Sequence, residues 1–402
     1  MTTTPDVTGR KRRYLDVDVV TKAVDRLAEL YRDGHRVIVS VSGGKDSTVI
    51  AELAIMAARL TDRLPIEVCT RDEEVMYPGT FEHLERMAER PEVDFTWFIA
   101  RMPVVNVFDR VNPYWWTFDE RVAPEDWVRQ PPWQYVEEIN EQFIEAKVTR
   151  ERFPPARDDL DTFVVTGIRG AESPTRIRSI GSSARGSGRY DKAHLTKVNR
   201  WGVRTVRPIY DWEDGDVWKF IADERLDYNR AYDVMVRMGI GRHRLRIGPP
   251  TQRLAEIEKI QMASRAWPQW FDRVCERVGG IRTAAQFGLA AVSPHRRPEE
   301  SYADAYRRQV TGPGNPEWIR ERGEKILTFM QERHRSHAAG DIPDGADCPL
   351  CHSKDLTPAA QPIGCYRSLL KVMYLGDPHS NRQLVLPIVD QSVFREGKSY
   401  YQ

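Results

Sequence analysis

Residues 42–47 read Ser-Gly-Gly-Lys-Asp-Ser, which places two glycines, a lysine, a carboxylate and two hydroxyls in one short stretch. A β-branched apolar run, Val37–Val41, precedes the stretch, and a run typical of a helix, Thr48–Leu60, follows it. Glycines at such a turn let backbone N–H groups approach an anion, and a helix N-terminus adds positive potential. This order predicts a phosphate-binding loop. Its candidate contacts are Ser42, Gly43, Gly44, Lys45, Asp46 and Ser47.

The spacing of this loop differs from that of the Walker loop, which requires Gly-x-x-x-x-Gly-Lys followed by Ser or Thr. We expect Asp46 or Ser47 to cap the helix that follows. A glycine-rich surface turn is the alternative interpretation, but the strand before and the helix after favour phosphate binding.

A second polar turn, Gly167–Arg176, follows another apolar run at Thr162–Thr166. It contains two arginines, whose forked guanidinium groups suit phosphate or sulfate oxygens. Two such turns at neighbouring strand ends would form one anion pocket, because ligands of doubly wound sheets bind outside the carboxyl ends of the strands. The candidates in this turn are Gly167, Arg169, Glu172 and Arg176.

An acidic turn, Arg71–Thr80, follows the predicted strand Ile66–Thr70 and should lie at the same edge of the sheet. Asp72, Glu74 and Tyr77 are therefore candidates for ribose or metal contacts. The alternative is the acidic first turn of an ordinary helix.

A Cys-Pro-Leu-Cys-His stretch near the C-terminus has the spacing of a zinc knuckle, and a third cysteine follows fourteen positions later. A structural zinc with three cysteines and one histidine is one interpretation. A redox-active pair, unbound thiols and an iron–sulfur cluster that also uses Cys275 are the others. The candidate ligands are Cys348, Cys351, Cys365 and either His352 or His379.

The elements that must position these residues belong to a chain of 402 residues with a formal net charge of +1. The balanced charge gives no global field toward nucleic acid or a membrane, although local basic patches stay possible. No stretch approaches the ~20 apolar residues of a transmembrane helix, and the basic start lacks the apolar region of a secretory signal. Five cysteines do not form a disulfide framework, so we expect a reduced, cytoplasmic setting.

Strands and helices alternate over the first 244 residues, which predicts an α/β fold with a doubly wound, mostly parallel sheet. A tryptophan-rich segment, residues 111–133, should be an irregular loop, either a functional lid or stacking wall or a loop that packs into the core. Besides the elements above, we predict strands at Phe95–Ala100 and Val203–Tyr210, and helices at Val17–Tyr31, Gln134–Lys147 and Trp212–Ala222.

The second half of the chain has the pattern of a helical extension. We therefore divide the chain into a flexible tail over residues 1–16, a nucleotide-binding α/β domain over 17–244, and a helical extension over 245–402 with the cysteine knuckle. The helices predicted in the extension are Gln252–Ala266, Pro268–Val278, Thr283–Ala291, Ser301–Gln309 and Pro316–His334.

Four stretches together resemble the PP-loop ATP pyrophosphatase superfamily and its phosphoadenosine phosphosulfate (PAPS) reductase-like family: SGGKDS, DEEVMYPGT, GIRGAESPTR and RPIYDWEDGDVW. With NPYWWTFDERVAPEDWVRQPP and CYRSLLKVMYLGD, the chain resembles phage- and prophage-borne members of the immunoglobulin-binding regulator A type. The resemblance covers most of residues 20–380. It implies a nucleotide α-hydrolase-like core with a helical C-terminal extension, in a bacterium or a phage-infected host.

This resemblance implies binding of ATP or a related adenosine nucleotide, with cleavage that adenylates an acceptor and releases pyrophosphate. The activated acceptor would serve sulfur transfer or nucleic-acid modification, and a ParB-like nuclease-fold protein is the expected partner. Mg²⁺ would be held by Asp46, Asp72 or Glu74, since it takes one or two carboxylates and keeps several waters. The expected catalytic residues are Lys45, Asp46, Arg169 and Arg176.

The chain departs from true PAPS reductases, because it lacks their C-terminal Glu-Cys-Gly-x-His element and the paired Cys-Cys segments of iron–sulfur relatives. Two alternatives to adenylation therefore stay open. One is a sulfonucleotide reductase that draws its thiol from Cys348 or Cys351. The other is a non-catalytic, nucleotide-sensing regulator that acts with a ParB-like DNA-binding partner.

Overall fold

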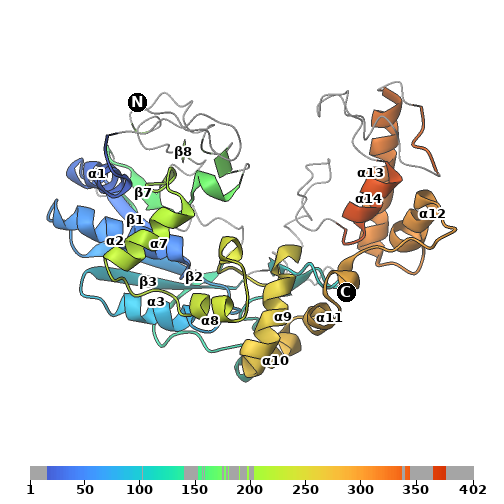
Figure 1. Cartoon of the computed structure of the whole chain (residues 1–402), viewed down its shortest axis with the longest axis horizontal. Coiled ribbons are helices and arrows are strands. Elements are labelled where there is room, and N and C mark those ends of the chain that lie inside the picture. Colours follow the sequence, from blue (N-terminus) through green and yellow to red (C-terminus); the bar gives the residue numbers. More distant parts are fainter. Residues whose placement is uncertain are drawn as a thin grey trace. The chain divides into compact units, whose positions relative to one another are not determined.

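The structure is a computed structural model that describes residues 16–101, 103–139, 153–155, 157, 159–173, 176–177, 180, 190, 197–198, 203–336, 340–344 and 365–376. The chain forms two compact units. Unit 1 comprises Met1–Ala100 and Pro131–Gly248, and unit 2 comprises Arg101–Gln130 and Pro249–Gln402. Both units are drawn in Figure 1, and each is described by itself below.

Unit 1 is built on one sheet with the strand order β6-β3-β2-β1-β7-β9-β8. The pairs β3–β2, β2–β1, β1–β7 and β7–β9 are parallel, and β8 is antiparallel to β9. This arrangement confirms the predicted α/β fold with a mostly parallel sheet. The strands are β1 (Arg36–Val41), β2 (Ile66–Asp72), β3 (Val93–Arg101), β6 (Val136–Ile139), β7 (Thr162–Val165), β8 (Lys197–Val198) and β9 (Val203–Val206).

The central strand β1 is buried on both faces, as its continuous β-branched run predicts. Val39 is paired with Val68 of β2 and Val165 of β7, and all three side chains are fully buried. Burial of such side chains from water contributes about 1.5–3 kcal/mol each. The strand ends that carry the two polar turns are therefore held on the most rigid part of the sheet.

Helices pack against this sheet, and Figure 1 shows α1, α2 and α7 next to one another. The first helix begins at Asp18, whose carboxylate accepts the backbone N–H groups of Val20 and Thr21. The helices of unit 1 are α1 (Val19–Arg32), α2 (Lys45–Arg59), α3 (Thr80–Ala88), α7 (Asp214–Asp223) and α8 (Ala231–Arg237), with short 3₁₀ turns at Gly170–Glu172 and Arg242–Arg244.

Two predictions of local structure around the sheet of unit 1 are wrong. The segment predicted as the helix Gln134–Lys147 contains strand β6, because Val136–Ile139 joins the sheet edge beside β3 and tertiary pairing overrides helix propensity. The cap of α2 is Gly44, and neither Asp46 nor Ser47, since the helix begins at Lys45. Asp46 then lies in the first turn, with its side chain available for ion pairs.

The tryptophan-rich segment is not wholly irregular, which corrects the prediction of a loop. Strands β4 (Pro103–Val105) and β5 (Tyr114–Trp116) form an antiparallel pair, followed by a 3₁₀ turn at Pro124–Asp126. Trp115 and Trp127 are buried within unit 2, so these two side chains pack in a core. Trp133, in unit 1, is 87% exposed.

Unit 2 is mainly helical, as the pattern of its sequence predicts. One hydrophobic core of unit 2 contains side chains from α12, α13 and α14 around Tyr306 and Ile319, which are fully buried. Its helices are α9 (Ile257–Ala266), α10 (Pro268–Arg277), α11 (Ile281–Phe287), α12 (Tyr302–Tyr306), α13 (Glu317–Ser336) and α14 (Tyr366–Met373), with 3₁₀ turns at Leu254–Glu256 and Gly288–Val292 and a π-helical turn at Arg307–Thr311.

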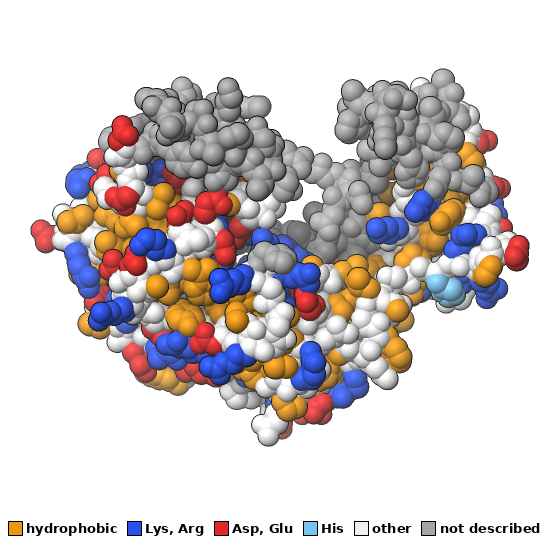
Figure 2. Space-filling model, in the orientation of Figure 1, with side chains coloured by type: hydrophobic (Ala, Val, Ile, Leu, Met, Phe, Trp, Pro, Cys, Tyr) orange, Lys and Arg blue, Asp and Glu red, His pale blue; other side chains and the backbone are white. Residues whose placement is uncertain are grey.

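The surface agrees with the balanced composition of the chain. Figure 2 shows basic and acidic side chains interspersed over the face in view of each unit. Among the helices that the structure describes, none is long and apolar enough to cross a membrane.

Candidate functional site

The glycine loop turns sharply at the carboxyl end of β1. Gly43 has a φ of +71°, and a Cβ added there would lie 2.6 Å from the Cγ2 atom of Thr80. Both the backbone conformation and the lack of space require glycine at this position. Gly44 then caps α2, so the loop leads directly into the helix N-terminus that the sequence predicts.

Lys45 is the first residue of α2, and it is buried with 2% of its surface exposed. Its Nζ atom lies 2.9 Å from Oδ2 of Asp46. A buried ammonium group needs such a partner, because an unpaired charge away from water is costly. The lysine that the sequence predicts as a phosphate contact is thus held in an ion pair inside the site.

The second polar turn meets the first, as the sequence predicts for neighbouring strand ends. Arg169, which follows β7, is 3% exposed, and its Nε atom lies 2.5 Å from Oδ1 of Asp46. A Cβ added at Gly167 would lie 3.0 Å from the backbone carbon of Asp46, so the close approach of the two turns depends on that glycine. Lys45, Asp46 and Arg169 therefore form one cluster.

Asp214 completes this cluster from a third element, α7. Its Oδ1 atom lies 3.1 Å from Nζ of Lys45 and 3.1 Å from Nη2 of Arg169. Its side chain is 47% exposed, in contrast to the two buried cations. Asp214 is not among the residues predicted from the sequence, because the RPIYDWEDGDVW motif contains several acidic residues and no spacing that distinguishes one of them. The only signal in the sequence was the density of acidic residues in that motif.

Glu172 and Arg176 lie beside the cluster, and they form an ion pair with each other. Oε1 of Glu172 is 3.9 Å from Nη2 of Arg169, so this acidic side chain also borders the buried arginine. Arg176 is more exposed, with 38% of its side chain accessible. Of the two arginines in the turn, Arg169 therefore lies at the centre and Arg176 at the margin.

Several polar groups of the glycine loop form hydrogen bonds with other groups of the protein. The backbone N–H of Lys45 donates to the hydroxyl of Tyr232 at 3.0 Å, and that of Ser42 donates to Oγ of Ser47 at 3.2 Å. The Ser47 hydroxyl donates to the carbonyl of Gly44 at 2.8 Å. Burial raises the pKa of Tyr232 well above its usual range, so its phenol stays protonated. These bonds fix the shape of the loop.

Asn229, which no motif in the sequence indicates, connects the glycine loop to α3 and α8. Its side-chain amide donates to the carbonyl of Gly43 at 2.9 Å and to the hydroxyl of Thr80 at 2.8 Å. Its carbonyl oxygen accepts the backbone N–H of Ala231 at 2.9 Å. The residue is fully buried, so each of these bonds replaces contact with water.

The tryptophans of the RPIYDWEDGDVW motif anchor α7 to the rest of unit 1. Trp212 is fully buried and contacts Phe220, and its indole N–H donates to the carbonyl of Val19 at 3.3 Å. Trp218 packs edge-to-face against Tyr232, whose hydroxyl binds the loop. These contacts place the first turn of α7, and with it Asp214, beside the cluster.

Asp72, Glu74 and Tyr77, the candidates of the acidic turn, are all buried. Oδ1 of Asp72 accepts the backbone N–H of Glu74 at 2.8 Å, and Oδ2 accepts the indole N–H of Trp97 at 3.0 Å. Glu74 has a φ of +63°, which is unusual for a residue with a side chain. Asp72 therefore stabilises this strained turn.

Asp46 and Asp72, two of the three carboxylates predicted to hold Mg²⁺, do not fit a resident ion. Both oxygens of Asp46 bind cationic side chains, and both oxygens of Asp72 accept hydrogen bonds from the protein. Within the described residues, no group of three or more His, Cys, Asp or Glu side chains is arranged to hold a metal. We therefore derive no step through a protein-bound magnesium ion.

The predicted zinc knuckle lies almost wholly outside the described residues, which exclude Cys348, Cys351, His352 and His379. Cys365 is described: it caps α14, is 1% exposed, and its sulfur lies 3.4 Å from Oγ of Ser368.

Cys275, the other candidate cluster ligand, lies on α10 in unit 2. Burial raises the pKa of its thiol to about 11, so the thiol is protonated at neutral pH and is a poor nucleophile.

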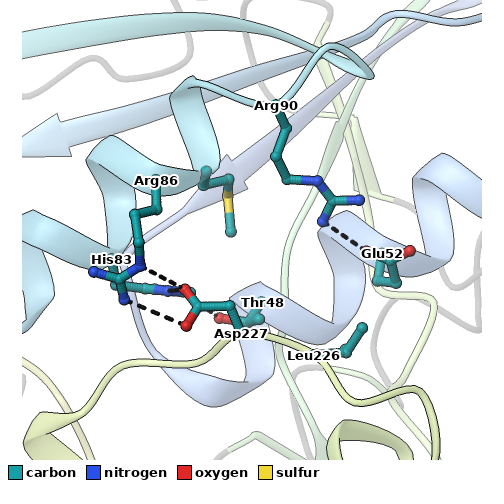
Figure 3. Close-up of a pocket in the computed structure, with 8 residues that line it drawn as sticks. Thr48, Glu52, His83, Arg86, Arg90, Leu226 and Asp227 are labelled. Carbon is teal, nitrogen blue, oxygen red and sulfur yellow. Dashed lines mark hydrogen bonds and ion pairs between the residues drawn. The ribbon is translucent and has the colours of Figure 1, made fainter.

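A second polar cluster lines a cavity of about 370 Å³ that includes Thr48 and Glu52 of α2 (Figure 3). Oγ1 of Thr48 lies 2.9 Å from Nε2 of His83, and Nδ1 of His83 lies 3.0 Å from Oδ2 of Asp227. Burial is the main cause that lowers the pKa of His83, so the imidazole is neutral at pH 7. Arg86 donates to Asp227, and Arg90 donates to Glu52.

This second cluster supports the glycine loop through a hydrogen bond to its backbone. The hydroxyl of Thr48 also lies 3.1 Å from the carbonyl of Gly44, so the chain Asp227–His83–Thr48 ends at the loop. Its charged groups are paired with one another, which is typical of a structural network between helices. We assign it a supporting role.

A family comparison agrees with the motifs. Residues 126–286 match the model of the phosphoadenosine phosphosulfate reductase domain. The matched segment contains Arg169 and Asp214, and it does not contain the glycine loop. The match supports the resemblance to PAPS reductase-like proteins over that segment, which is less than half of the chain.

Among known proteins, the chain is 24% identical over 384 residues to the uncharacterized protein YbdN of Escherichia coli (strain K12). The aligned residues cover 90% of this chain and 89% of YbdN. Similar solved structures include the PAPS reductase from Candida auris in a phosphate complex, with 13% identity, 53% of this chain and 84% of that chain covered, and a TM-score of 0.29. The FMN adenylyltransferase of Candida glabrata in complex with ATP has 13% identity, 55% and 62% coverage, and a TM-score of 0.32. Both structural likenesses are remote.

Proposed function

We propose that unit 1 binds ATP or a related adenosine nucleotide by its phosphate groups and transfers the adenylyl group to an acceptor, with release of pyrophosphate. One observation carries this proposal: two buried cations, Lys45 and Arg169, meet at the adjoining ends of β1 and β7 beside a glycine loop and a helix N-terminus. Buried cations at such a position suit a polyvalent phosphate group.

In the proposed reaction, a nucleophilic atom of the acceptor attacks the α-phosphorus. The bond between the α-phosphorus and its bridging oxygen to the β-phosphate breaks, and the electron pair leaves with pyrophosphate. Lys45 would stabilise the charge that develops on the pyrophosphate, and Arg169 would stabilise the α-phosphate. Catalysis of this kind is mainly positioning and electrostatic stabilisation. Mg²⁺ would arrive with the nucleotide as part of the substrate.

The other predicted contacts stay proposals within this scheme. Ser42, Gly43 and Gly44 would border the phosphates, and Asp72 and Glu74 would shape the turn near the ribose. Glu172 and Arg176 would flank the acceptor side. The acceptor itself would belong to sulfur transfer or nucleic-acid modification.

The direct test is incubation with Mg²⁺ and ATP labelled at the γ-phosphate, followed by measurement of labelled pyrophosphate, with ATP affinity measured by calorimetry. We expect binding that Lys45→Ala weakens and that the matched control Lys219→Ala leaves unchanged, because Lys219 is an exposed lysine on α7. Absence of ATP binding by the wild-type protein would contradict the proposal.

A sulfonucleotide reductase is the second candidate function, favoured by the family match over residues 126–286. It would need a thiol, and we propose Cys348 or Cys351 for that role. Sulfite release from PAPS in the presence of a dithiol, lost in Cys348→Ser or Cys351→Ser, would support it. Pyrophosphate release from ATP without sulfite production would exclude it in favour of adenylation.

A regulatory role is favoured by the complete internal pairing of Lys45 and Arg169 with carboxylates. A phage-type regulator of this kind would sense a nucleotide without turnover and act with a ParB-like partner at DNA. Nucleotide binding without pyrophosphate release, together with nucleotide-dependent association with such a partner, would support this alternative.

A structural zinc at Cys348, Cys351 and Cys365, with His352 or His379 as the fourth ligand, is a separate proposal for unit 2. An iron–sulfur cluster that also uses Cys275 is its alternative, with a different metal content. The burial of Cys365 at the start of α14 supports a structural role for that residue.

A further inference from the structure

We infer that Asp214 is a built-in competitor at the anion site: its carboxylate occupies the position between Lys45 and Arg169 that an oxyanion group of the ligand takes, and it leaves when the ligand binds. The inference rests on the proposed phosphate binding and adds the location of one phosphate group. It also assigns the site to anions with more than one charge.

The geometry around Asp214 is that of a bound anion. A single oxygen, Oδ1, lies 3.1 Å from an ammonium nitrogen and 3.1 Å from a guanidinium nitrogen that belong to different strand ends. A phosphate oxygen has the same acceptor character and forms the same charge-assisted bonds. The carboxylate therefore marks where an oxyanion is bound.

The charges of the cluster show why the carboxylate must leave. Lys45 and Arg169 contribute two positive charges, and Asp46 and Asp214 contribute two negative charges, so the four side chains together are neutral. An incoming anion gains little from a neutral cluster. Without Asp214, the remaining groups have a net positive charge and attract an oxyanion.

Asp214 is the acidic residue that is able to leave. Asp46 is 19% exposed, adjoins Lys45 on the same helix and binds both cations through separate oxygens. Asp214 is 47% exposed and uses one oxygen for both cations. Its carboxylate has only to rotate into the neighbouring solvent, where its hydration offsets much of the lost pairing.

The surroundings of Asp214 allow this rotation without a change in fold. Asp211 forms an ion pair with Arg26, and Trp212 is fully buried, so the chain before α7 is anchored. Glu213 and Asp216 form a capping box that holds the first turn. A Cβ added at Gly215 would meet nothing within 4 Å, so there is open space at the tip of the turn.

The exchange has a consequence for selectivity. A monovalent anion such as acetate would replace one carboxylate by another and gain no additional charge interaction. Pyrophosphate or a nucleoside triphosphate carries several negative charges, so it replaces Asp214 as the partner of Lys45 and Arg169 and also binds to the loop. We therefore expect the site to select polyvalent phosphates, because an anion must bind more strongly than the Asp214 carboxylate to displace it.

The test is calorimetry with inorganic pyrophosphate in metal-free buffer on the full chain. The wild-type protein is compared with Asp214→Asn and with Asp223→Asn, a matched change of charge on the same helix at a residue that is 54% exposed. We expect Asp214→Asn to bind pyrophosphate about tenfold more tightly, which corresponds to ~1.4 kcal/mol. Asp223→Asn should stay within about twofold of wild type, the range of screened surface charges.

Weaker binding by Asp214→Asn would overturn the inference, because it would mean that the carboxylate contributes to ligand binding. Equal affinity, or no binding by either protein, would overturn it as well. Binding by Asp214→Asn alone would support it. Thermal melting checks that both variants fold. A separate titration with ATP distinguishes the two proposals. Tighter binding of pyrophosphate by Asp214→Asn, without ATP binding by either protein, would contradict the nucleotide function and would still support the role of Asp214.

Discussion

At the scale of single residues, the site is defined by two cations that the fold removes from water. Lys45 and Arg169 have 2% and 3% of their surface exposed, and each binds the same pair of carboxylates. Burial of a charge is costly unless it is paired, so the acidic side chains are as necessary to the site as the basic ones. Substitutions of these residues will change both ligand binding and the net charge of the cluster.

The first prediction concerns Lys45→Ala. Loss of a charged hydrogen-bond donor should weaken nucleotide binding by about 1.5–3 kcal/mol. Calorimetry with ATP measures the change, and thermal melting should show that the α/β fold persists. Affinity equal to that of wild type would contradict a role for Lys45 as a phosphate contact.

The second prediction concerns Arg169→Lys, which keeps the positive charge. Arg169 reaches Asp46 through Nε and Asp214 through Nη2, and a single ammonium group cannot reproduce this fork. We expect at least a tenfold loss of nucleotide affinity, or about 1.4 kcal/mol. Lys219→Arg is the matched control on the exposed side of α7, and full affinity in Arg169→Lys would show that charge alone matters.

At the scale of elements, the glycine loop is held by neighbours far along the chain. Asn229 bonds to the Gly43 carbonyl and the Thr80 hydroxyl, while Tyr232 accepts the N–H of Lys45. The segment before α8 therefore fixes both the turn and the start of α2. Such over-determined turns keep an unusual backbone conformation in place.

The third prediction is that Asn229→Ala destabilises unit 1. It leaves the buried carbonyl of Gly43 without this donor, and each unsatisfied buried group costs about 1–3 kcal/mol. Asn229→Asp keeps the oxygen that accepts the N–H of Ala231 but loses the two bonds that the amide donates. Comparison of the two variants therefore distinguishes the contribution of the donated bonds from that of the accepted bond. Urea unfolding measures both variants, and stability equal to wild type in both would contradict the role of Asn229.

The fourth prediction is a pH dependence of stability that comes from His83. Its pKa in the folded protein lies below the ordinary value near 6.5, chiefly because the imidazole is buried, although Asp227 opposes part of the shift. The unfolded state therefore binds more protons than the folded state once the pH falls below about 6.5. The free energy of unfolding should decrease as the pH falls from there through the folded-state pKa.

Denaturant unfolding between about pH 7.5 and pH 5 tests this prediction. His83→Gln should be less stable at neutral pH and should show a flatter dependence on pH. His295→Gln, at an exposed histidine in unit 2, is the control. An unchanged pH slope in His83→Gln would rule out His83 as its source.

At the scale of the whole molecule, the chain consists of two units with separate cores. The residues of the anion cluster all belong to unit 1, and the cysteine stretch belongs to unit 2. The family match over residues 126–286 includes parts of both. Changes in the cysteine stretch should therefore affect the stability of unit 2 more than the binding of anions in unit 1.

The fifth prediction concerns metal in unit 2. Protein purified without added metal should contain zinc, and a chelator should lower the melting temperature of unit 2 while phosphate binding partly survives. Elemental analysis is the direct measurement. Less than about a tenth of an equivalent of zinc or iron, with the thiols of Cys348, Cys351 and Cys365 all titratable, would contradict the metal site and favour a redox role.

The sequence alone was sufficient for the two polar turns and the sheet that joins them. Val37–Val41 and Thr162–Thr166 are local runs rich in β-branched residues, each followed by a turn that contains glycine, and parallel strands bring their carboxyl ends to one edge. The convergence of Lys45 and Arg169 therefore followed from short-range patterns and one topological rule. The helical character of residues 252–334 followed from periodicity in the same way.

Tertiary structure decided the rest, because the deciding contacts join distant parts of the chain. Val136–Ile139 has no local signal that outweighs helix propensity, and only the free edge of β3 makes it a strand. Tyr232 and Asn229 bind the glycine loop from 187 and 186 positions away. Asp214 is one acidic residue among several in its motif, and only the packing of Trp212 places its carboxylate between two buried cations.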